Sequence, residues 1–390
     1  MQYFVLKSHS IPSDWLQAVC CSVPTPESLG MVTAEAVKCL ADVPNYTSSL
    51  RDGWAVSSAD NGKQRVRGSF SVENGEAEQS LPVGQAVWVN TGGVIPQGAD
   101  AVIACRDALE AERMLETVHP WQNIERRGCD WKAGETILPA GVRIGAREMA
   151  LLYEAGVIRV SGWASPRVAV VATGSEMTEH AGSIAVGFRR CSNASYAAAL
   201  MRRIGISDVR TLVVPDDEAV LARTLLELDS VCDVIVTVGG TGRGRRDYTR
   251  RAVLAAGGRF VGADSQADSP FVTARLRHAG MMGLPGNPLA VMMLTQRVLL
   301  ETVRKVFHLP ESPAQFIEAR MAYAVEPGVS GELCVALERH GDDPFEPWTA
   351  RPIMKGTGRM RVFETASGTV PLMGQGIAAG ETVTVQLFRN

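Results

Sequence analysis

The stretch "DVIVTVGGTGRGRRDYTRRAVLAAGG", Asp233–Gly258, decides the fold. It begins with a β-branched run that leads directly into glycines, which predicts a buried strand. The loop holds four glycines and a lone acid, Asp247, and the pattern "DYTRRAVLAA" predicts a helix that Gly257 closes. A strand, a glycine-rich loop and a helix in this order predict one part of a βαβ unit.

The segments on both sides repeat this alternation. The sequence predicts strands at 167–173 and 209–214, and helices at 192–204, 217–229 and 289–307. The first of these helices has Ser192 or Asn193 as its expected N-cap. The alternation predicts a parallel sheet in a three-layer α/β domain that covers residues 166–309. Such sheets bind ligands outside the carboxyl ends of their strands, where this chain has its glycine-rich loops.

The flanking segments predict a multidomain protein, α/β plus β. Residues 46–118 are rich in glycine, valine and proline and predict a small β domain, and residues 1–45 with 119–165 form an elongated N-terminal region that contains a helix at 147–156. Residues 310–390 predict a small β barrel or sandwich, of which we expect the barrel. Its strand-like runs are 322–326, 332–337, 369–373 and 381–388.

Composition excludes several classes of protein. A net charge of −3 argues against a dedicated nucleic-acid binder, and no apolar run reaches the roughly 18 residues of a membrane span. The N-terminus does not resemble a signal peptide, and the eight cysteines lack C-x-x-C spacing, so we expect free thiols in a cytoplasmic protein. The six histidines are scattered and show no metal motif.

The loop from Gly239 to Asp247 fits neither standard nucleotide fingerprint. A Walker loop needs Lys and Ser or Thr where this chain has Arg245 and Arg246, and the third glycine of G-x-G-x-x-G is missing. One interpretation is that the glycines let backbone N–H groups converge on an anion. The alternative is a tight connection with solvated arginines and Asp247 as a helix N-cap.

Other segments hold further candidate residues. "ATGSEM" places Glu176 just after a strand, and the two prolines of "GLPGNP", Pro285 and Pro288, fix a rigid turn. Three segments outside the α/β domain add polar groups: "RDGWAV" holds Asp52, "NTGGVIPQGADAVI" holds Thr91 and Gly92, and "RRGCDWKAGE" holds Asp130. The alternatives are a helix-capping acid, a structural turn and solvated turn residues.

In combination and order, these six segments resemble the MoeA family, the molybdopterin molybdenumtransferases that include the gephyrin E domain. The resemblance covers essentially the whole chain, and "GLPGNP" and "TGGVIPQGADAVI" are its most specific matches. It implies four subdomains, with an α/β molybdopterin-binding domain that MogA-type adenylylating proteins share. It also implies an elongated homodimer whose active cleft lies between one chain's α/β domain and the other chain's N-terminal part.

The resemblance also implies an activity and a site. Family members bind adenylylated molybdopterin and molybdate, hydrolyse the adenylate with a divalent cation, release AMP and insert the metal. The implied catalytic residues are Asp52, Asp130, Glu176 and Asp247, and the last two would bind Mg²⁺. The implied partners are a MogA-type adenylyltransferase and molybdoenzyme apoproteins. The implied molybdopterin-binding residues are Thr91, Gly92, Thr173, Gly174, Ser175, Asn193, Gly239, Gly240, Thr241, Gly242, Pro285, Gly286, Asn287 and Pro288.

The chain departs from the family pattern at the oxyanion site. Two lysines of the family's "KPGKPF" are Gln266 and Ser269 here, and Ala336 aligns with an oxyanion-binding arginine. A hydrogen bond to a charged group contributes about 1.5–3 kcal/mol, so the loss of two or three weakens molybdate binding by about 3–9 kcal/mol. The additional arginines, which are either compensating oxyanion ligands or surface charge, are Arg245, Arg246 and Arg359.

Three hypotheses follow. The first is a working molybdenumtransferase with a rearranged oxyanion site. The second is a paralogue that binds molybdopterin or a nucleotide as a carrier, scaffold or regulator, without inserting metal. The third is a hydrolase related to the CinA-type proteins, which share the α/β domain. The match over the full length argues against the third, while the retained acids favour the first and the lost lysines favour the second.

Overall fold

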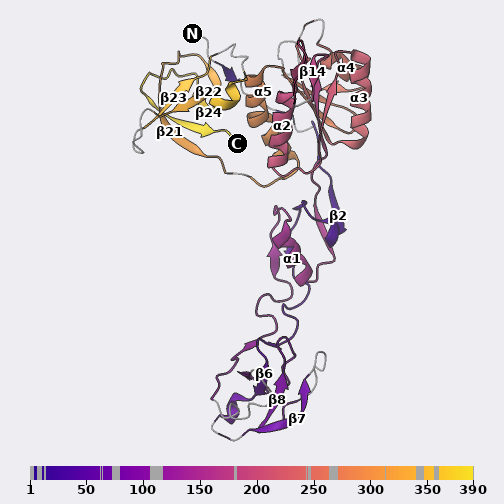
Figure 1. Cartoon of the computed structure of the whole chain (residues 1–390), viewed down its shortest axis with the longest axis vertical. Coiled ribbons are helices and arrows are strands. Elements are labelled where there is room, and N and C mark those ends of the chain that lie inside the picture. The colour runs from indigo at the N-terminus through magenta and orange to yellow at the C-terminus, as the bar shows by residue number, and fades with distance from the viewer. Residues whose placement is uncertain are drawn as a thin grey trace. The chain divides into compact units, whose positions relative to one another are not determined.

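The computed structural model resolves into two compact units, Cys21–Gly162 and Met1–Cys20 with Trp163–Asn390, which we call the smaller and the larger unit (Figure 1). The structure describes residues 4–6, 11–12, 15–61, 63, 65–72, 80–105, 117–179, 182–242, 244, 247–262, 271–311, 313–339, 347–354 and 360–389.

A six-stranded sheet forms the centre of the larger unit. Its order is β16-β13-β17-β20-β19-β18, and the pairs among the first four strands are parallel, whereas β19 and β18 pair antiparallel. Every residue of β13 and β17 is buried, as expected for parallel strands covered on both faces. The strands are β13 (Val168–Thr173), β16 (Val209–Val214), β17 (Val234–Val238), β18 (Arg259–Phe260), β19 (Val272–Arg275) and β20 (Gly280–Leu284).

Helices cover both faces of this sheet and complete the predicted three-layer domain. Helices α3 (Glu218–Val231) and α4 (Thr249–Ala255) pack together on one face, and α2 (Ser192–Arg203) and α5 (Pro288–Leu294) pack on the other (Figure 1). Helix α5 continues through a π-helical segment (Thr295–Leu299) into α6 (Leu300–Val306). This π-helical segment interrupts the helix predicted at 289–307.

The beginning of α2 differs from the sequence-based expectation. A short parallel pair, β14 (Met177–Thr178) and β15 (Arg189–Arg190), precedes the helix. The N-cap is Cys191, not Ser192 or Asn193, and no side chain caps the first turn. The N-terminal N–H groups of α2 therefore have no side-chain partner from the cap residue.

The C-terminal part of the larger unit is the predicted β barrel. Strands β22, β23, β21, β25 and β24 follow one another, and β24 pairs with β22 to close the ring. The runs at 332–337, 369–373 and 381–388 lie in strands, but 322–326 forms only a single bridge after β21. The elements are β21 (Phe316–Met321), β22 (Ser330–Glu338), β23 (Trp348–Pro352), α7 (Val362–Thr365), β24 (Gly368–Met373) and β25 (Thr382–Leu387).

The first twenty residues belong to the larger unit, which differs from the sequence-based grouping of 1–45 with 119–165. Strand β1 (Val5–Leu6) pairs with β22 of the barrel. Trp15 is completely buried, and its indole N–H donates to the carbonyl of Met281 at 2.9 Å. Gly280 leaves room for that ring, because a Cβ there would lie 2.9 Å from it. Pairing and packing of this kind cannot be read from the local sequence.

The smaller unit contains a four-stranded sheet, β7-β8-β6-β9, three short sheets, β10-β5, β11-β4 and β2-β12-β3, and helix α1 (Ala146–Glu154). Consecutive residues of β6, such as Trp54 and Ala55, belong to two separate apolar clusters, so both faces of the four-stranded sheet are packed. The remaining strands are β2 (Cys20–Pro24), β3 (Val32–Thr33), β4 (Val37–Lys38), β5 (Ser48–Ser49), β6 (Gly53–Val56), β7 (Val66–Val72), β8 (Gln85–Val89), β9 (Ala101–Ala104), β10 (Ile124–Glu125), β11 (Thr136–Leu138) and β12 (Arg159–Trp163).

Two further expectations concern thiols and membrane spans. All eight cysteines are free, as their spacing predicts. Among the helices of the described residues, none is long and apolar enough to cross a bilayer.

Candidate functional site

A cavity of about 1080 Å³ lies at the carboxyl ends of β13, β17 and β20. The loops after these three strands form much of its wall, and the segment from Phe188 through the start of α2 and Met360 add to it. We call it the strand-end cavity. Ten of the predicted site residues line it: Thr173, Gly174, Glu176, Asn193, Gly239, Gly240, Asp247, Gly286, Asn287 and Pro288.

The loop after β17 packs tightly against the loop after β13. Gly239 and Gly240 have φ values of +100° and +61°, which favour glycine. A Cβ at either position would lie 2.9–3.0 Å from the hydroxyl of Thr173. The N–H of Thr249 donates to the carbonyl of Gly240 at 3.1 Å, which ties the loop to α4. The glycines therefore let two strand-end loops and a helix meet at one edge of the cavity.

Asp247 folds back over its own loop and does not cap the helix. Its carboxylate accepts from the N–H of Gly244, and its own N–H donates to the Gly244 carbonyl at 3.0 Å. A Cβ at Gly242 would lie 2.8 Å from the carboxylate, so a larger residue there would displace it. Helix α4 has Tyr248 as its N-cap, without a side-chain cap bond. The interpretation of Asp247 as an N-cap is thus wrong.

Glu176 brings a second carboxylate to the same cavity from the loop after β13. A Cβ at Gly174 would lie 2.9 Å from a carboxylate oxygen of Glu176, so the acid lies directly over this glycine. Asp216 lines the cavity as well, and its N–H donates to the hydroxyl of Ser175 at 3.0 Å. Ser175 thus acts on the wall through a neighbour and does not line the cavity itself.

The third loop, "GLPGNP", connects β20 to α5 and is hydrogen-bonded to α2. The side-chain amide of Asn193 donates to the carbonyl of Gly286 at 2.9 Å. Asn287 caps α5, because its side-chain oxygen accepts from the N–H of Ala290 at 3.1 Å, and Pro288 is the first helical residue. The side-chain oxygen of Asn193 is buried and has no hydrogen-bond partner within the described part of the chain. Asn193 of α2 therefore has one acceptor available at the cavity.

Three other predicted residues of this domain do not line the cavity. Thr241 is almost completely buried, and its methyl group lies 3.0 Å from where a Cβ of Gly283 would stand. Gly242 lies under the Asp247 carboxylate, and Pro285 precedes the turn that lines the cavity. Thr241 and Pro285, which are buried, support the wall from behind, whereas Gly242 is exposed.

Sequence reasoning missed several residues of the cavity. Arg189 and Arg190 of β15 line it and are exposed, and Met360 reaches it from the segment before α7. The hydroxyl of Ser192 lies 3.7 Å from the sulfur of Met360. The signal was present as "GFRRCSN", in which two arginines stand directly before a helix N-terminus. Two cations beside uncapped N–H groups favour the binding of an anion.

The carboxylates fit a hard divalent cation that also binds phosphate. Mg²⁺ in such sites uses one or two carboxylates together with substrate phosphates and water. Glu176 and Asp247 line one cavity beside two arginines, so acidic and basic groups face the same space. Within the described ranges no three His, Cys, Asp or Glu side chains gather as a metal site of their own. The donor set thus suits a cation that is shared with a bound phosphate.

Three of the predicted residues of the smaller unit, Asp52, Thr91 and Gly92, lie close together in that unit. The Asp52 carboxylate accepts from the backbone N–H of Thr91 at 2.6 Å and from its hydroxyl at 2.9 Å. These bonds, the backbone one first, hold the pKa of Asp52 below its usual value. Gly92 follows in the same turn, where its N–H donates to Ser49 at 2.7 Å. Asp130 lies apart from them, with its N–H bonded to the carbonyl of Val43 at 3.1 Å.

The oxyanion residues singled out from the sequence lie outside the described residues. This holds for the arginines and for the two positions where the family has lysines: Arg245, Arg246, Gln266, Ser269 and Arg359.

Comparison with known proteins covers both units. The family model for the MoeA N-terminal region (domain I and II) matches residues 6–156, and that for a probable molybdopterin binding domain matches residues 169–305. The molybdopterin molybdenumtransferase of Haemophilus influenzae is 28% identical over 289 residues, which are 72% of this chain and 71% of that protein. Gephyrin of Dictyostelium discoideum is 29% identical over 260 residues, 58% of this chain and 36% of that protein.

A solved structure shares the fold over nearly the whole chain. The crystal structure of a molybdopterin biosynthesis MoeA protein from Pyrococcus horikoshii has a TM-score of 0.70 and 25% sequence identity, and the match covers 96% of each chain. Both units, the matched family models and this structure lead to the same assignment: the chain belongs to the MoeA/gephyrin family.

Proposed function

We propose that the protein is a molybdopterin molybdenumtransferase that binds adenylylated molybdopterin in the strand-end cavity. One observation carries the proposal: Glu176 and Asp247, from the loops after two different strands, line one cavity with the glycine backbone of Gly239–Gly240. Acids that share a cavity with anion-binding groups suit a phosphate ester that is bound with a cation. The names of relatives such as the Haemophilus influenzae enzyme support the same substrate class.

In this proposal each group has a role in the release of AMP. Hydrolysis breaks one P–O bond of the phosphoanhydride between molybdopterin and AMP. Water adds its OH to the phosphorus whose bond breaks, and its other proton goes to the bridging oxygen that remains on the second phosphate. The first turn of α2 and Arg189 and Arg190 bind phosphate oxygens. Glu176 and Asp247 would hold Mg²⁺, which would neutralise phosphate charge. Molybdate is then the second substrate: its molybdenum binds the two dithiolene sulfurs, and one molybdate oxygen leaves as water with the two thiol protons.

Arg189 and Arg190 also bear on the missing lysines. The family's oxyanion lysines are replaced by Gln266 and Ser269, yet the strand-end cavity has two arginines in its wall. Arginine binds oxyanions through two parallel hydrogen bonds, so we propose that this pair takes over part of the lost charge. The second candidate function, a paralogue that binds molybdopterin or nucleotide without inserting metal, rests on the same two replacements.

The proposal extends to assembly and partners. We propose a homodimer, in which Asp52 and Thr91 of one chain serve the cavity of the other, as the family resemblance implies. We also propose that a MogA-type adenylyltransferase supplies the substrate and that molybdoenzyme apoproteins receive the product. Light scattering tests the dimer: a mass near that of one 41.8 kDa chain contradicts it.

Complementation of a bacterium that lacks its molybdenumtransferase tests the function. We expect the wild-type chain to restore molybdoenzyme activity. Soluble expression without rescue contradicts metal insertion. In that case, binding of adenylylated molybdopterin to the purified protein would support the non-inserting paralogue, and no binding would remove both functions.

A further inference from the structure

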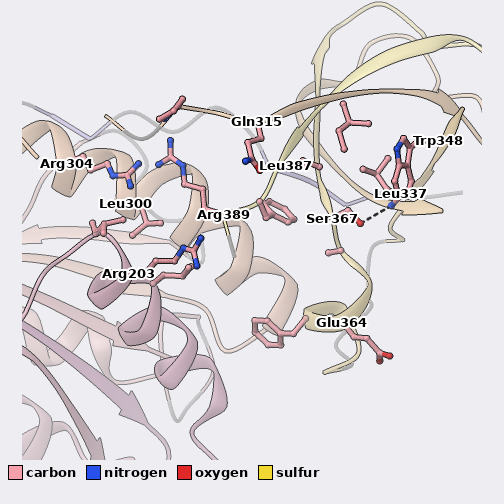
Figure 2. A pocket seen from close by; sticks show the side chains of 17 residues that line it. Arg203, Leu300, Arg304, Gln315, Leu337, Trp348, Glu364, Ser367, Leu387 and Arg389 are labelled. Carbon is pink, nitrogen blue, oxygen red and sulfur yellow. Dashed lines mark hydrogen bonds between the residues drawn. The ribbon is translucent and has the colours of Figure 1, made fainter. Parts of the chain in front are cut away.

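A second cavity, of about 740 Å³, lies within the larger unit between the α/β domain and the barrel (Figure 2). The C-terminal part of α2 and helix α6 form one wall, and the barrel with α7 forms the other. We call it the interdomain cavity. It shares α2 with the strand-end cavity, but the nearest lining residues, Ala194 and Leu200, are about 9 Å apart along the helix. The two cavities have no lining residue in common.

Three arginines gather on the helix side of the interdomain cavity. Arg203 comes from α2, Arg304 from α6 and Arg389 from the end of the barrel (Figure 2). Their closeness is not local in sequence, since the three positions span nearly half of the chain. The one acid in the wall, Glu364 of α7, points away from them in Figure 2. The lining therefore carries an excess of positive charge.

Arg304 is the residue that indicates a ligand. Only 8% of it is exposed, and its Nε and Nη1 atoms are buried without a hydrogen-bond partner among the residues that the structure describes. A buried charge without a partner is strongly unfavourable, so such groups are normally paired. The guanidinium fork matches the oxygens of a carboxylate or phosphate, which would supply the missing acceptors.

The position of Arg389 is fixed by the fold. Gln296, in the π-helical segment, donates to the carbonyl of Arg389 at 2.8 Å and accepts from its N–H at 3.2 Å. The Arg389 guanidinium forms an ion pair with Glu301 of α6 at 2.8 Å. Glu301 thus offsets one of the three positive charges, and the buried guanidinium of Arg304 is left with no such pair in the described chain. The site is therefore preformed and still lacks an acceptor.

The opposite wall is mostly apolar. Leu337, Trp348 and Leu387 of the barrel line it (Figure 2). Ile317 and Phe363 add to this apolar surface, and Gln315, Ser367 and Glu364 are the polar residues on this side. A single inorganic anion would fill only a small part of about 740 Å³ and would leave this wall in contact with water. An organic molecule with one anionic end can satisfy both walls at once.

We propose that the interdomain cavity binds a small organic oxyanion, whose carboxylate or phosphate pairs with Arg304 and Arg203 and whose apolar body packs against the barrel wall. The ligand would join the α/β domain to the barrel. This site is separate from the strand-end cavity and does not depend on the proposed transferase activity.

Calorimetric titration of the full-length protein tests the proposal. The probes are phenyl phosphate, benzoate, inorganic phosphate and neutral benzyl alcohol, so that phosphate, carboxylate and the apolar body are assessed separately. We expect phenyl phosphate or benzoate to bind at least about tenfold more tightly than inorganic phosphate, because inorganic phosphate has no apolar body to pack against the barrel wall. Benzyl alcohol should bind weakest, because it brings no charge to Arg304.

Variants locate the binding. Arg304→Met should weaken the organic anions by about 10- to 100-fold, the worth of a charge-assisted hydrogen-bond pair. Arg203→Met should weaken binding of the organic anions less than Arg304→Met. Because Arg203 is exposed, this variant should fold, and it tests the site even if Arg304→Met does not fold. Lys305→Met removes a charge from the next residue of α6, which is exposed, and should leave the affinity for the organic anions unchanged. The double variant Arg189→Ala/Arg190→Ala, in the other cavity, should also retain this binding.

Two results would overturn the proposal. One is equal affinity of the organic anions for wild type, Arg304→Met and Arg203→Met. The other is equal affinity of benzyl alcohol and phenyl phosphate, which would mean that the arginines select no anion. Neither result depends on whether the chain rescues a molybdenumtransferase-deficient bacterium, so the two proposals can fail independently.

Discussion

The two ends of α2 border two cavities that present positive charge by different means. At the N-terminal end, glycine-rich loops, an uncapped helix terminus and the exposed Arg189 and Arg190 form the strand-end cavity. At the C-terminal end, the buried Arg304 and the anchored Arg389 form the interdomain cavity. The first uses backbone geometry, which local sequence specifies. The second uses tertiary packing between two domains, which local sequence does not reveal.

The largest expected effect is the loss of stability caused by replacing Gln296, which connects the barrel end to the helices of the α/β domain. Its buried side chain donates to Tyr196 at 3.1 Å and bonds both backbone groups of Arg389. Gln296→Ala should lower the free energy of unfolding by about 2–4 kcal/mol, because three hydrogen bonds of about 1 kcal/mol each and side-chain packing are lost. Urea denaturation followed by fluorescence measures the change.

The control for this variant is Gln386→Ala in β25. The backbone carbonyl of Gln386 accepts from the Arg297 guanidinium at 3.0 Å, and alanine keeps this bond, so the unfolding free energy should change by less than about 0.5 kcal/mol. If both variants lose the same stability, Gln296 does not connect the barrel to the α/β domain, and the interdomain cavity is not held in place as described.

Arg189 and Arg190 test the other end of α2. In an Arg304→Met background, which removes the second site, Arg189→Ala/Arg190→Ala should weaken molybdate binding by about 10- to 100-fold, because two charge-assisted contacts are lost from an exposed site. Equilibrium dialysis gives the affinity. Arg223→Ala removes an exposed arginine of α3 that lines neither cavity, and it should bind like the background. Equal affinity of all three proteins would make the arginine pair ordinary surface charge.

Gly240 and Gly257 separate backbone strain from loop packing. Both have positive φ, +61° and +74°, but only at Gly240 would a Cβ come within 3.1 Å of side chains, the hydroxyls of Thr173 and Thr249. Gly257→Ala should lose about 1 kcal/mol of stability from strain, and Gly240→Ala about 1–3 kcal/mol. Thermal and urea unfolding of the two variants measure the difference. An equal loss would mean that the two loops do not pack as the structure has them.

Tyr196 gives the smallest effect, at high pH. Burial first of all raises the pKa of Tyr196 to about 12 from its usual value of 10. Because the folded-state pKa is raised, the associated stabilisation is complete below pH 10 and is lost as the pH rises towards about 12. The free energy of unfolding should therefore fall more between pH 9 and 11 for wild type than for Tyr196→Phe. If the unfolding free energies of wild type and Tyr196→Phe fall in parallel as the pH rises, the Tyr196 phenol is in contact with water and this prediction is wrong.

The sequence predicted the α/β domain well because its signals are local. Buried β-branched strands such as β13 and β17 end directly in glycines, so both the layer order and the strand-end loops follow from the pattern. The barrel strand β21 was missed because it alternates exposed charged residues with buried Ala319 and Met321, and its run is short. The Trp15 contact with β20 and the pairing of β1 with β22 depend on residues hundreds of positions apart.

The residues of the strand-end cavity also divide into those that local sequence predicts and those that it does not. Glu176, Gly239 and Asp247 were predicted because each follows a strand of one parallel sheet, whose carboxyl ends meet at one edge. Arg189 and Arg190 were missed, because a two-residue strand before α2 carries little periodicity. The N-cap of α2 was assigned to a serine or asparagine by residue type, but the chain reaches the helix through β15 (Arg189–Arg190), and Cys191 is the one residue between that strand and the first helical residue.

The most direct test of the strand-end cavity is the rate of AMP release from adenylylated molybdopterin by purified protein, with molybdate and Mg²⁺ present. Asp247→Ala removes a preorganised charged group and should slow the release by at least about 100-fold. Asp208→Ala removes a half-buried acid that forms an ion pair with Arg210 at 3.2 Å and lines neither cavity, and it should release AMP like wild type. If Asp247→Ala releases AMP as fast as wild type, this cavity is not the site of the reaction.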